Sequence, residues 1–175
     1  MDTRVKVAVI GGGVAGCSVA YHLTRLGCPD VAVLEADELT SGSTWHAAGL
    51  CTQYHSSLQL MKLLRTSVEL YDGGLEADTG VDVGYHRCGS LRLAAITERV
   101  DELYARRAMA NSVGIPFEIV RPDRVAELWP LAGLDWVLAA GWLPTDGWVD
   151  PARLAHAFAD GARRRGARVL RHARA

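Results

Sequence analysis

The sequence predicts an α/β fold that begins with a parallel β-sheet, and three observations near its start lead to this prediction. Residues 5–10 are almost wholly apolar, as expected of a parallel strand that is covered on both faces. After a glycine-rich turn, apolar residues recur at the three- and four-residue steps of a helix. A second apolar run, residues 31–34, follows Gly27 and completes a strand, turn, helix and strand. The apolar residues expected on one face of this helix are Ala15, Val19, Ala20 and Leu23.

The glycine-rich turn has the G-x-G-x-x-G spacing of a dinucleotide-binding, Rossmann-like fold. Gly11 permits a tight turn, Gly13 lets the backbone approach a pyrophosphate, and Gly16 lets the helix pack close to the strand. The pyrophosphate is expected at the start of the helix, beside Val14 and Ala15, because free N–H groups and the helix dipole favour negative charge there.

The second strand ends in an acid. Glu35 comes about 20 residues after the glycines, where the fingerprint needs a carboxylate to accept the ribose hydroxyls of an adenosine. A carboxylate repels a 2′-phosphate, so NADP is disfavoured, and Ala36 is expected to line the same site. The fingerprint by itself does not separate NAD from FAD.

Composition excludes several classes of protein. The 175 residues are 49% apolar and 22% charged, which is ordinary for one soluble globular domain. A net charge of -1 shows no bias toward nucleic acid or anionic lipid, and no apolar run is long enough to span a membrane. The four cysteines form no C-x-x-C pair, so we expect no metal site and no disulfide framework. A cytoplasmic location is expected, or the mitochondrial matrix in a eukaryote, although the chain shows no transit peptide.

Residues 38–50 are rich in small and hydroxyl side chains that would let the backbone line a cofactor. Their core is the block Gly42, Ser43, Thr44, Trp45, His46, Ala47, Ala48, Gly49 and Leu50. Placed after a fingerprint that ends in Glu35, this block resembles the flavin loop of the dimethylglycine and sarcosine dehydrogenase family, within the wider amine-oxidising group that includes D-amino acid oxidase. The resemblance implies FAD as the cofactor. It also implies that His46 bonds covalently to FAD, through addition of a neutral imidazole nitrogen to the 8α carbon of the flavin.

Two alternatives accompany this reading of His46. An isolated loop histidine often does no more than hydrogen-bond its own backbone. Some members of the wider group also bind FAD without a covalent bond.

The remaining segments are expected to form scaffold. Residues 81–96 should give two short strands, or one bent strand, with a break at Gly89 and Ser90, and the resemblance makes this the start of the substrate-domain sheet. Thr97 is expected to cap the next helix, which should bury Val100, Leu103, Tyr104 and Ala108. Further helices are expected over residues 57–75, 97–112, 122–129 and 151–165, and further strands over residues 116–120, 137–143 and 167–170.

The last of these strands should lie beside the second, so that the parallel sheet has the order third, second, first. Arginines cluster at the end of the preceding helix and beyond it. We interpret them as cations that complement the helix dipole rather than as a nucleic-acid patch, because no aromatic residues are interleaved among them. These arginines are Arg163, Arg164, Arg165, Arg168, Arg171 and Arg174.

The resemblance covers almost the whole chain but only the N-terminal portion of a family member. It implies that residues 1–175 are the N-terminal part of a single FAD-dependent oxidoreductase domain, with the fingerprint in residues 5–35 and the flavin loop in residues 38–50. The fold is therefore expected to be incomplete, with inserted helices. The other strands of the sheet, the catalytic residues and a tetrahydrofolate-binding part are expected beyond residue 175.

The function implied by the resemblance is oxidative demethylation of dimethylglycine or sarcosine by hydride transfer to covalently bound flavin. The substrate is then a small N-methyl amino acid, and the electron acceptor is an electron-transfer flavoprotein or oxygen. No nucleic acid is expected as a partner. One alternative is a non-catalytic regulatory protein similar to the regulatory subunit of pyruvate dehydrogenase phosphatase, and another is an inert gene fragment.

Overall fold

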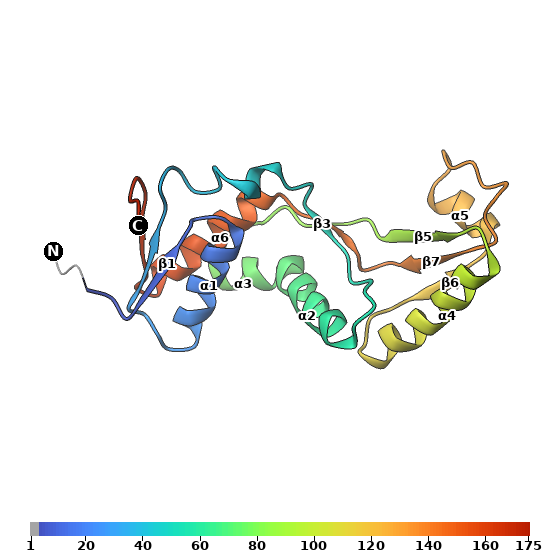
Figure 1. The fold of residues 1–175 in the computed structure, drawn as a ribbon, viewed down its shortest axis with the longest axis horizontal. Coiled ribbons are helices and arrows are strands. Elements are labelled where there is room, and N and C mark those ends of the chain that lie inside the picture. The colour runs from blue at the N-terminus through green and yellow to red at the C-terminus, as the bar shows by residue number, and fades with distance from the viewer. Residues whose placement is uncertain (1–3) are drawn as a thin grey trace. The chain divides into compact units, whose positions relative to one another are not determined.

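The computed structural model describes residues 4–175, and these residues fall into two compact units. The first unit comprises the chain up to Leu50 together with Tyr71–Tyr85 and Val149–Ala175. The second unit comprises Cys51–Leu70 and His86–Trp148. The first unit is therefore discontinuous in sequence, and Figure 1 shows its blue N-terminal and red C-terminal elements together. That both units belong to one oxidoreductase domain stays a prediction.

The first unit is built on a parallel sheet of three strands: β1 (Val7–Ile10), β2 (Val31–Leu34) and β9 (Arg168–Leu170). Their order is β1-β2-β9, which confirms the predicted order of third, second and first strand. Within the described chain β1 pairs only with β2, and the side chain of Ile10 is 75% exposed. The cover expected on both faces of this strand is thus not present among residues 4–175.

Two helices, α1 (Val14–Arg25) and α6 (Pro151–Arg164), pack against each other in this unit (Figure 1). The ring of Tyr21 on α1 lies 5.2 Å from the ring of Phe158 on α6, centroid to centroid. Gly161 makes room for it, because a Cβ there would lie 2.7 Å from the Tyr21 ring. Among the described residues, α1 therefore packs on α6, whose surface leaves space for the Tyr21 ring.

The face of α1 predicted from apolar spacing is wrong at two positions, because Ala15 and Val19 are exposed. The helix instead buries four residues on the side facing α6, and two of these carry hydroxyl groups that the apolar pattern does not count. They are Cys17, Ala20, Tyr21 and Thr24.

The helix predicted over residues 57–75 is interrupted. Helix α2 (Leu58–Glu69) belongs to the second unit and α3 (Leu75–Thr79) to the first, with the irregular segment Leu70–Gly74 between them. Gly73 has φ 94°, a left-handed conformation that glycine adopts without strain. Helical spacing continues through this segment, but the backbone turns there.

The second unit contains the antiparallel strands β5 (Ser90–Ala94), β7 (Ala139–Leu143) and β6 (Glu118–Val120), in the order β5-β7-β6. Their main core includes Met61 of α2 and Leu103 of α4 (Thr97–Ser112). A smaller core forms around Val125 of α5 (Pro122–Leu128). The short elements are η1 (Ser43–His46), β3 (Leu50–Cys51), β4 (His86–Arg87) and β8 (Gly147–Trp148).

Two details of α4 differ from the expectation. The residue that caps its N-terminus is Ile96, with Thr97 already helical and giving no side-chain cap. Tyr104 and Ala108 are exposed, whereas Leu103 is buried as predicted, together with Ala110. By contrast, the predicted start of α6 is confirmed, since the Asp150 carboxylate accepts hydrogen bonds from the next free amides and Pro151 follows it.

The buried acid Asp146 joins the start of β5 to the segment that contains Thr52 and Gln53, and the sequence analysis did not predict this role. Asp146 is 1% exposed and accepts hydrogen bonds from the backbone N–H of Gln53 (2.9 Å), the Thr52 hydroxyl (2.8 Å) and the Ser90 hydroxyl (2.6 Å). A buried carboxylate is tolerated when donors surround it in this way.

Across residues 4–175, no helix has the length and apolar character needed to cross a membrane.

Candidate functional site

A cleft of about 690 Å³ opens in the first unit at the carboxyl ends of β1 and β2. Its volume falls in the range of roughly 300–1,000 Å³ that is usual for small-molecule sites. Residues of both the glycine fingerprint and the loop after Glu35 line it. The lining consists of Ile10, Gly11, Gly13, Val14, Ala15, Gly16, Glu35, Ala36, Asp37, Ser41, Gly42, Ser43, Thr44, Ala47 and Arg174.

The start of helix α1 supplies free donors to this cleft. The N–H of Val14 donates to the hydroxyl oxygen of Thr44 at 3.0 Å, which satisfies the first amide of the helix. The N–H groups of Ala15 and Gly16 find no acceptor in the part of the chain that the structure describes. Unsatisfied amides at a helix N-terminus attract anionic groups, so this end of the cleft suits a phosphate.

Glycines are required at this turn because other atoms of the chain come too close for a side chain. A Cβ at Gly13 would lie 2.9 Å from the Thr44 hydroxyl oxygen, and a Cβ at Gly16 would overlap the carbonyl oxygen of Gly11. Gly11 itself has φ 101°. Larger residues would therefore push the helix away from the strand and the loop, which supports the roles expected from the fingerprint.

The carboxylate of Glu35 is held by the backbone. One oxygen accepts from the N–H of Asp37 at 2.9 Å and the other from the N–H of Gly12 at 2.6 Å. These two hydrogen bonds, with that from Asp37 the stronger influence, hold the pKa of Glu35 below its ordinary value. Each carboxylate oxygen keeps a further lone pair, so a fixed, ionised acceptor faces the cleft.

The predicted site residues divide into two groups. Those that line the cleft are Gly11, Gly13, Val14, Ala15, Gly16, Glu35, Ala36, Gly42, Ser43, Thr44 and Ala47. Those that lie outside its lining are Trp45, His46, Ala48, Gly49 and Leu50.

His46 is at the end of the short turn η1, next to the cleft-lining Ala47. Its imidazole is exposed and lies against the ring of Trp45, 4.8 Å between centroids. Its imidazole hydrogen-bonds neither to a side chain nor to the backbone of residues 4–175, so the alternative of an imidazole bonded to its own backbone is not seen.

The end of the flavin loop is tied to the start of α6. The carbonyl of Gly49 accepts from the N–H of Val149 at 2.9 Å, and Gly49 has φ 72°. A side chain at Gly49 would clash with the Val149 carbonyl, so this loop can close only over a glycine.

Sequence reasoning missed four cleft residues: Ile10, Asp37, Ser41 and Arg174. Arg174 had been grouped with the helix-end arginines. The signal that could have placed it is its position just after the third parallel strand, because the carboxyl ends of parallel strands meet at one edge of the sheet. Other members of that group form ion pairs, such as Arg171 with Glu38 at 2.7 Å.

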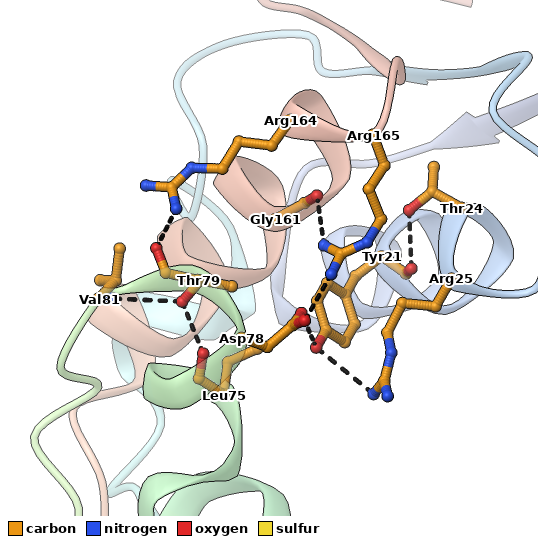
Figure 2. A network of polar contacts seen from close by, with 10 residues as sticks. All are labelled: Tyr21, Thr24, Arg25, Leu75, Asp78, Thr79, Val81, Gly161, Arg164 and Arg165. Atoms are coloured by element: carbon orange, nitrogen blue, oxygen red, sulfur yellow. Dashed lines mark hydrogen bonds and ion pairs between the residues drawn. The ribbon is translucent and has the colours of Figure 1, made fainter.

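A polar network holds α1 against its neighbours on the side away from the glycine turn. Figure 2 shows the Tyr21 hydroxyl pointing at Asp78 of α3, which Arg165 approaches from the end of α6. Arg164 donates to the carbonyl of Thr79 in the same α3 turn. Three segments that are distant in sequence thus meet around one tyrosine, and they fix the helix whose first turn lines the cleft.

Comparison with known proteins identifies the family. The "FAD dependent oxidoreductase" family matches residues 6–175. The chain belongs to this family. The expectation of FAD rather than NAD is thereby confirmed, and the glycine cradle, the free helix amides and the Glu35 acceptor fit the adenosine and pyrophosphate of that cofactor.

The chain is also similar to individual members of known function. The chain is 45% identical to mitochondrial dimethylglycine dehydrogenase of Rattus norvegicus over 93% of its length, and 39% identical to the mitochondrial pyruvate dehydrogenase phosphatase regulatory subunit of Mus musculus over 97%. It spans 19% of each of these relatives. The resemblance inferred from the flavin loop is confirmed.

Among solved structures, L-proline dehydrogenase from P. horikoshii matches 98% of the chain with a TM-score of 0.89 and 29% identity, and the match covers 45% of that chain. A Rossmann-like α/β fold is therefore confirmed. Among residues 4–175, no group of three or more His, Cys, Asp or Glu side chains could hold a metal ion.

Proposed function

We propose that this chain forms part of the FAD site of an amine dehydrogenase that oxidises an N-methylated glycine such as dimethylglycine or sarcosine. The observation that carries the proposal is the hydrogen bond from Val14 N–H to Thr44, because it joins the dinucleotide fingerprint to the block that resembles a flavin loop. Both then line one cleft. The 45% identity to a dimethylglycine dehydrogenase supports the substrate class.

Each part of the cleft has a proposed role. The free amides at Ala15 and Gly16 bind the pyrophosphate, and Glu35 accepts the ribose hydroxyls of the adenosine. The loop from Gly42 to Ala47 directs the flavin end of the cofactor. When bound, FAD supplies the redox chemistry by accepting a hydride from the N-methyl carbon of the substrate.

His46 is proposed as the residue that holds the flavin covalently. Its imidazole is exposed, has no hydrogen-bond partner among residues 4–175, and lies in the turn that borders the cleft. The Trp45 ring, tilted by 51° against the imidazole, limits the orientations that the imidazole can take. A nitrogen lone pair is therefore available to form a bond with the cofactor.

The remaining proposals follow the relatives rather than the cleft. The substrate is a small N-methyl amino acid, the electron acceptor is an electron-transfer flavoprotein or oxygen, and a tetrahydrofolate-binding part lies outside this chain. A mitochondrial matrix location applies if the organism is eukaryotic, because the dimethylglycine dehydrogenase relative is mitochondrial. In a bacterium the location is the cytoplasm.

The test is acid precipitation of the protein that carries this chain. The wild type should give a yellow pellet whose tryptic peptide containing His46 has gained the mass of FAD less two hydrogen atoms, one from the imidazole and one from the flavin methyl group. The His46→Ala variant should release all its flavin to the supernatant while keeping the wild-type circular dichroism. His156→Ala is the matched control, because this exposed histidine of α6 lies outside the cleft lining and should leave the pellet yellow. Flavin retained in the His46→Ala pellet would refute the covalent role.

A second candidate function is a non-catalytic regulatory role, which the 39% identity to the phosphatase regulatory subunit favours. The two are separated by adding dimethylglycine or sarcosine to the yellow protein without oxygen. A dehydrogenase then loses the visible absorbance of its oxidised flavin, because the flavin accepts a hydride. A regulatory protein keeps its colour with both amines.

A further inference from the structure

Arg174 is a free cation at the edge of the cofactor cleft. It is the basic residue in the cleft lining, and it also lines a second cleft of about 240 Å³ between the ends of the three parallel strands. Its side chain is exposed, and no group among residues 4–175 pairs with it. The neighbouring Arg171, by contrast, is paired with Glu38.

Backbone hydrogen bonding fixes the position of the Arg174 main chain. The N–H of Ala173 donates to the carbonyl of Glu35 at 2.8 Å, so the residue before Arg174 is bonded to the acid of the fingerprint. His172 has φ 55°, unusual for a residue with a Cβ, and its imidazole nitrogen Nε2 lies 3.1 Å from the Glu38 carboxylate. This turn brings the chain back over the end of β2.

The smaller cleft has the chemistry of a site for a flat, weakly polar ring. Apart from Glu35 and Arg174 its walls are aliphatic or backbone: Ile10, Gly11, Leu34, Ala36, Ala173 and Ala175. It shares Glu35 with the larger cleft, and therefore adjoins the place proposed for the ribose. A ring attached to that ribose would lie between the strand ends and the Arg174 side chain.

We infer that Arg174 stacks its guanidinium plane on the adenine ring of the bound dinucleotide and closes the outer side of the small cleft. This inference rests on the proposed function, because it needs an adenosine whose ribose is bound by Glu35. A planar, delocalised guanidinium stacks on aromatic rings, whereas a lysine ammonium cannot present a flat face. Arg174 thus contacts the adenine base, whereas the free amides of α1 bind the phosphates.

The experiment measures AMP and ADP binding by titration calorimetry to the full protein, prepared without flavin from riboflavin-starved cells. Arg174→Lys keeps the charge and removes the planar face, and Arg174→Gln removes the charge. Both variants should weaken AMP and ADP by the same factor, about threefold to tenfold for a partly exposed stacked cation. Arg168→Gln is the matched control, because it removes one arginine charge from β9 beside Asp30, outside both cleft linings. It should bind both nucleotides as the wild type does.

Other outcomes decide against the inference in distinguishable ways. If Arg174→Lys binds like the wild type and Arg174→Gln loses more affinity for ADP than for AMP, Arg174 contacts phosphate and the stacking role is wrong. Unchanged affinity in both variants, or an equal loss in Arg168→Gln, also overturns it. If the folded wild type binds neither nucleotide, the proposed dinucleotide cleft itself fails, and the inference fails with it.

Discussion

The hydroxyl of Tyr21 donates a 2.5 Å hydrogen bond to the carboxylate of Asp78, and this bond joins helix α1 to helix α3 (Figure 2). Arg165 donates to the other oxygen of the same carboxylate at 2.5 Å. Tyr21 is fully buried, while the Asp78 and Arg165 side chains are only 25% and 29% exposed. The first unit is thus held by an ion pair that is partly shielded from solvent.

Replacing Asp78 with Ala should lower the free energy of unfolding by about 1–3 kcal/mol, because a buried hydroxyl and a cation both lose their acceptor. Urea unfolding followed by circular dichroism measures this loss. Asp160→Ala is the control, since its pair with Arg163 lies within one helix and is more exposed, and it should cost less than about 1 kcal/mol. Equal losses in the two variants would show that the Tyr21 contact adds nothing.

The same carboxylate should make stability depend on acid pH. The hydrogen bond from Tyr21, followed by the contact with Arg165, lowers the pKa of Asp78 below its ordinary value of 3.8. A lowered folded-state pKa gives stability that is present above the unfolded pKa and is lost as pH falls through the folded pKa. Wild-type stability should therefore drop below about pH 4, and Asp78→Ala should show a smaller drop over the same range. Identical pH profiles would contradict the assignment.

Tyr21 should make stability depend on alkaline pH, with a loss as the pH rises rather than as it falls. Burial, and after it the hydrogen bond to Asp78, raises the pKa of Tyr21 above its ordinary value of 10.0. Its contribution is therefore complete below pH 10 and is lost as pH rises through the folded pKa. Tyr21→Phe should remove this part of the alkaline loss, which thermal melts across the pH range would detect. A Tyr21→Phe profile parallel to the wild type would count against it.

Glu35→Gln should weaken FAD binding by about tenfold to a hundredfold, the value of one charge-assisted hydrogen bond. The structure adds a second reason: the glutamine NH₂ group must face the N–H of either Gly12 or Asp37, where the carboxylate had accepted both. Quenching of flavin fluorescence measures the affinity, with every protein in the His46→Ala background so that FAD binds reversibly. Glu76→Gln is the control, because Glu76 of α3 is exposed and lies outside the cleft lining. Equal affinity in Glu35→Gln and the wild type would place the ribose elsewhere.

Thr44→Val should remove the acceptor for the first amide of α1 at nearly constant volume. The Thr44 side chain is 7% exposed, so water cannot readily replace it, and the loss of unfolding free energy should be about 1 kcal/mol, as for other helix caps. Denaturant unfolding checks this value. Thr44→Ser keeps the hydroxyl and should recover most of the loss; a serine variant as unstable as the valine variant would mean that the methyl group matters more than the bond.

The sequence predicted those parts of the fold whose cause is local. The signals for the first strand, the glycine turn and the helix lie close together in the sequence. The positions of β1, the start of α1 and β2 were therefore predicted correctly. The order β1-β2-β9 was also predicted correctly. The cap at Asp150 was correct for the same reason, because an N-cap depends only on the next two or three residues.

The errors arise where the local structure depends on a distant segment or on a backbone angle that the residue pattern does not reveal. The buried side of α1 is set by α6, which accommodates Tyr21 over Gly161, and no pattern within α1 contains that information. The break at Gly73 depends on a positive φ that helical spacing does not encode. Arg174 reaches the cleft only through the turn at His172, which again has a positive φ.

The pairing of β2 with β9 has a consequence for synthesis on the ribosome, because Ala32 pairs with Arg168 and the whole second unit is translated between them. At about 5–20 residues per second, β2 waits roughly 7–30 s for its neighbour. During that interval the nascent chain can fold the second unit while an apolar strand edge remains open. A chaperone that binds extended apolar segments should therefore engage the first fifty residues of this protein until β9 leaves the exit tunnel.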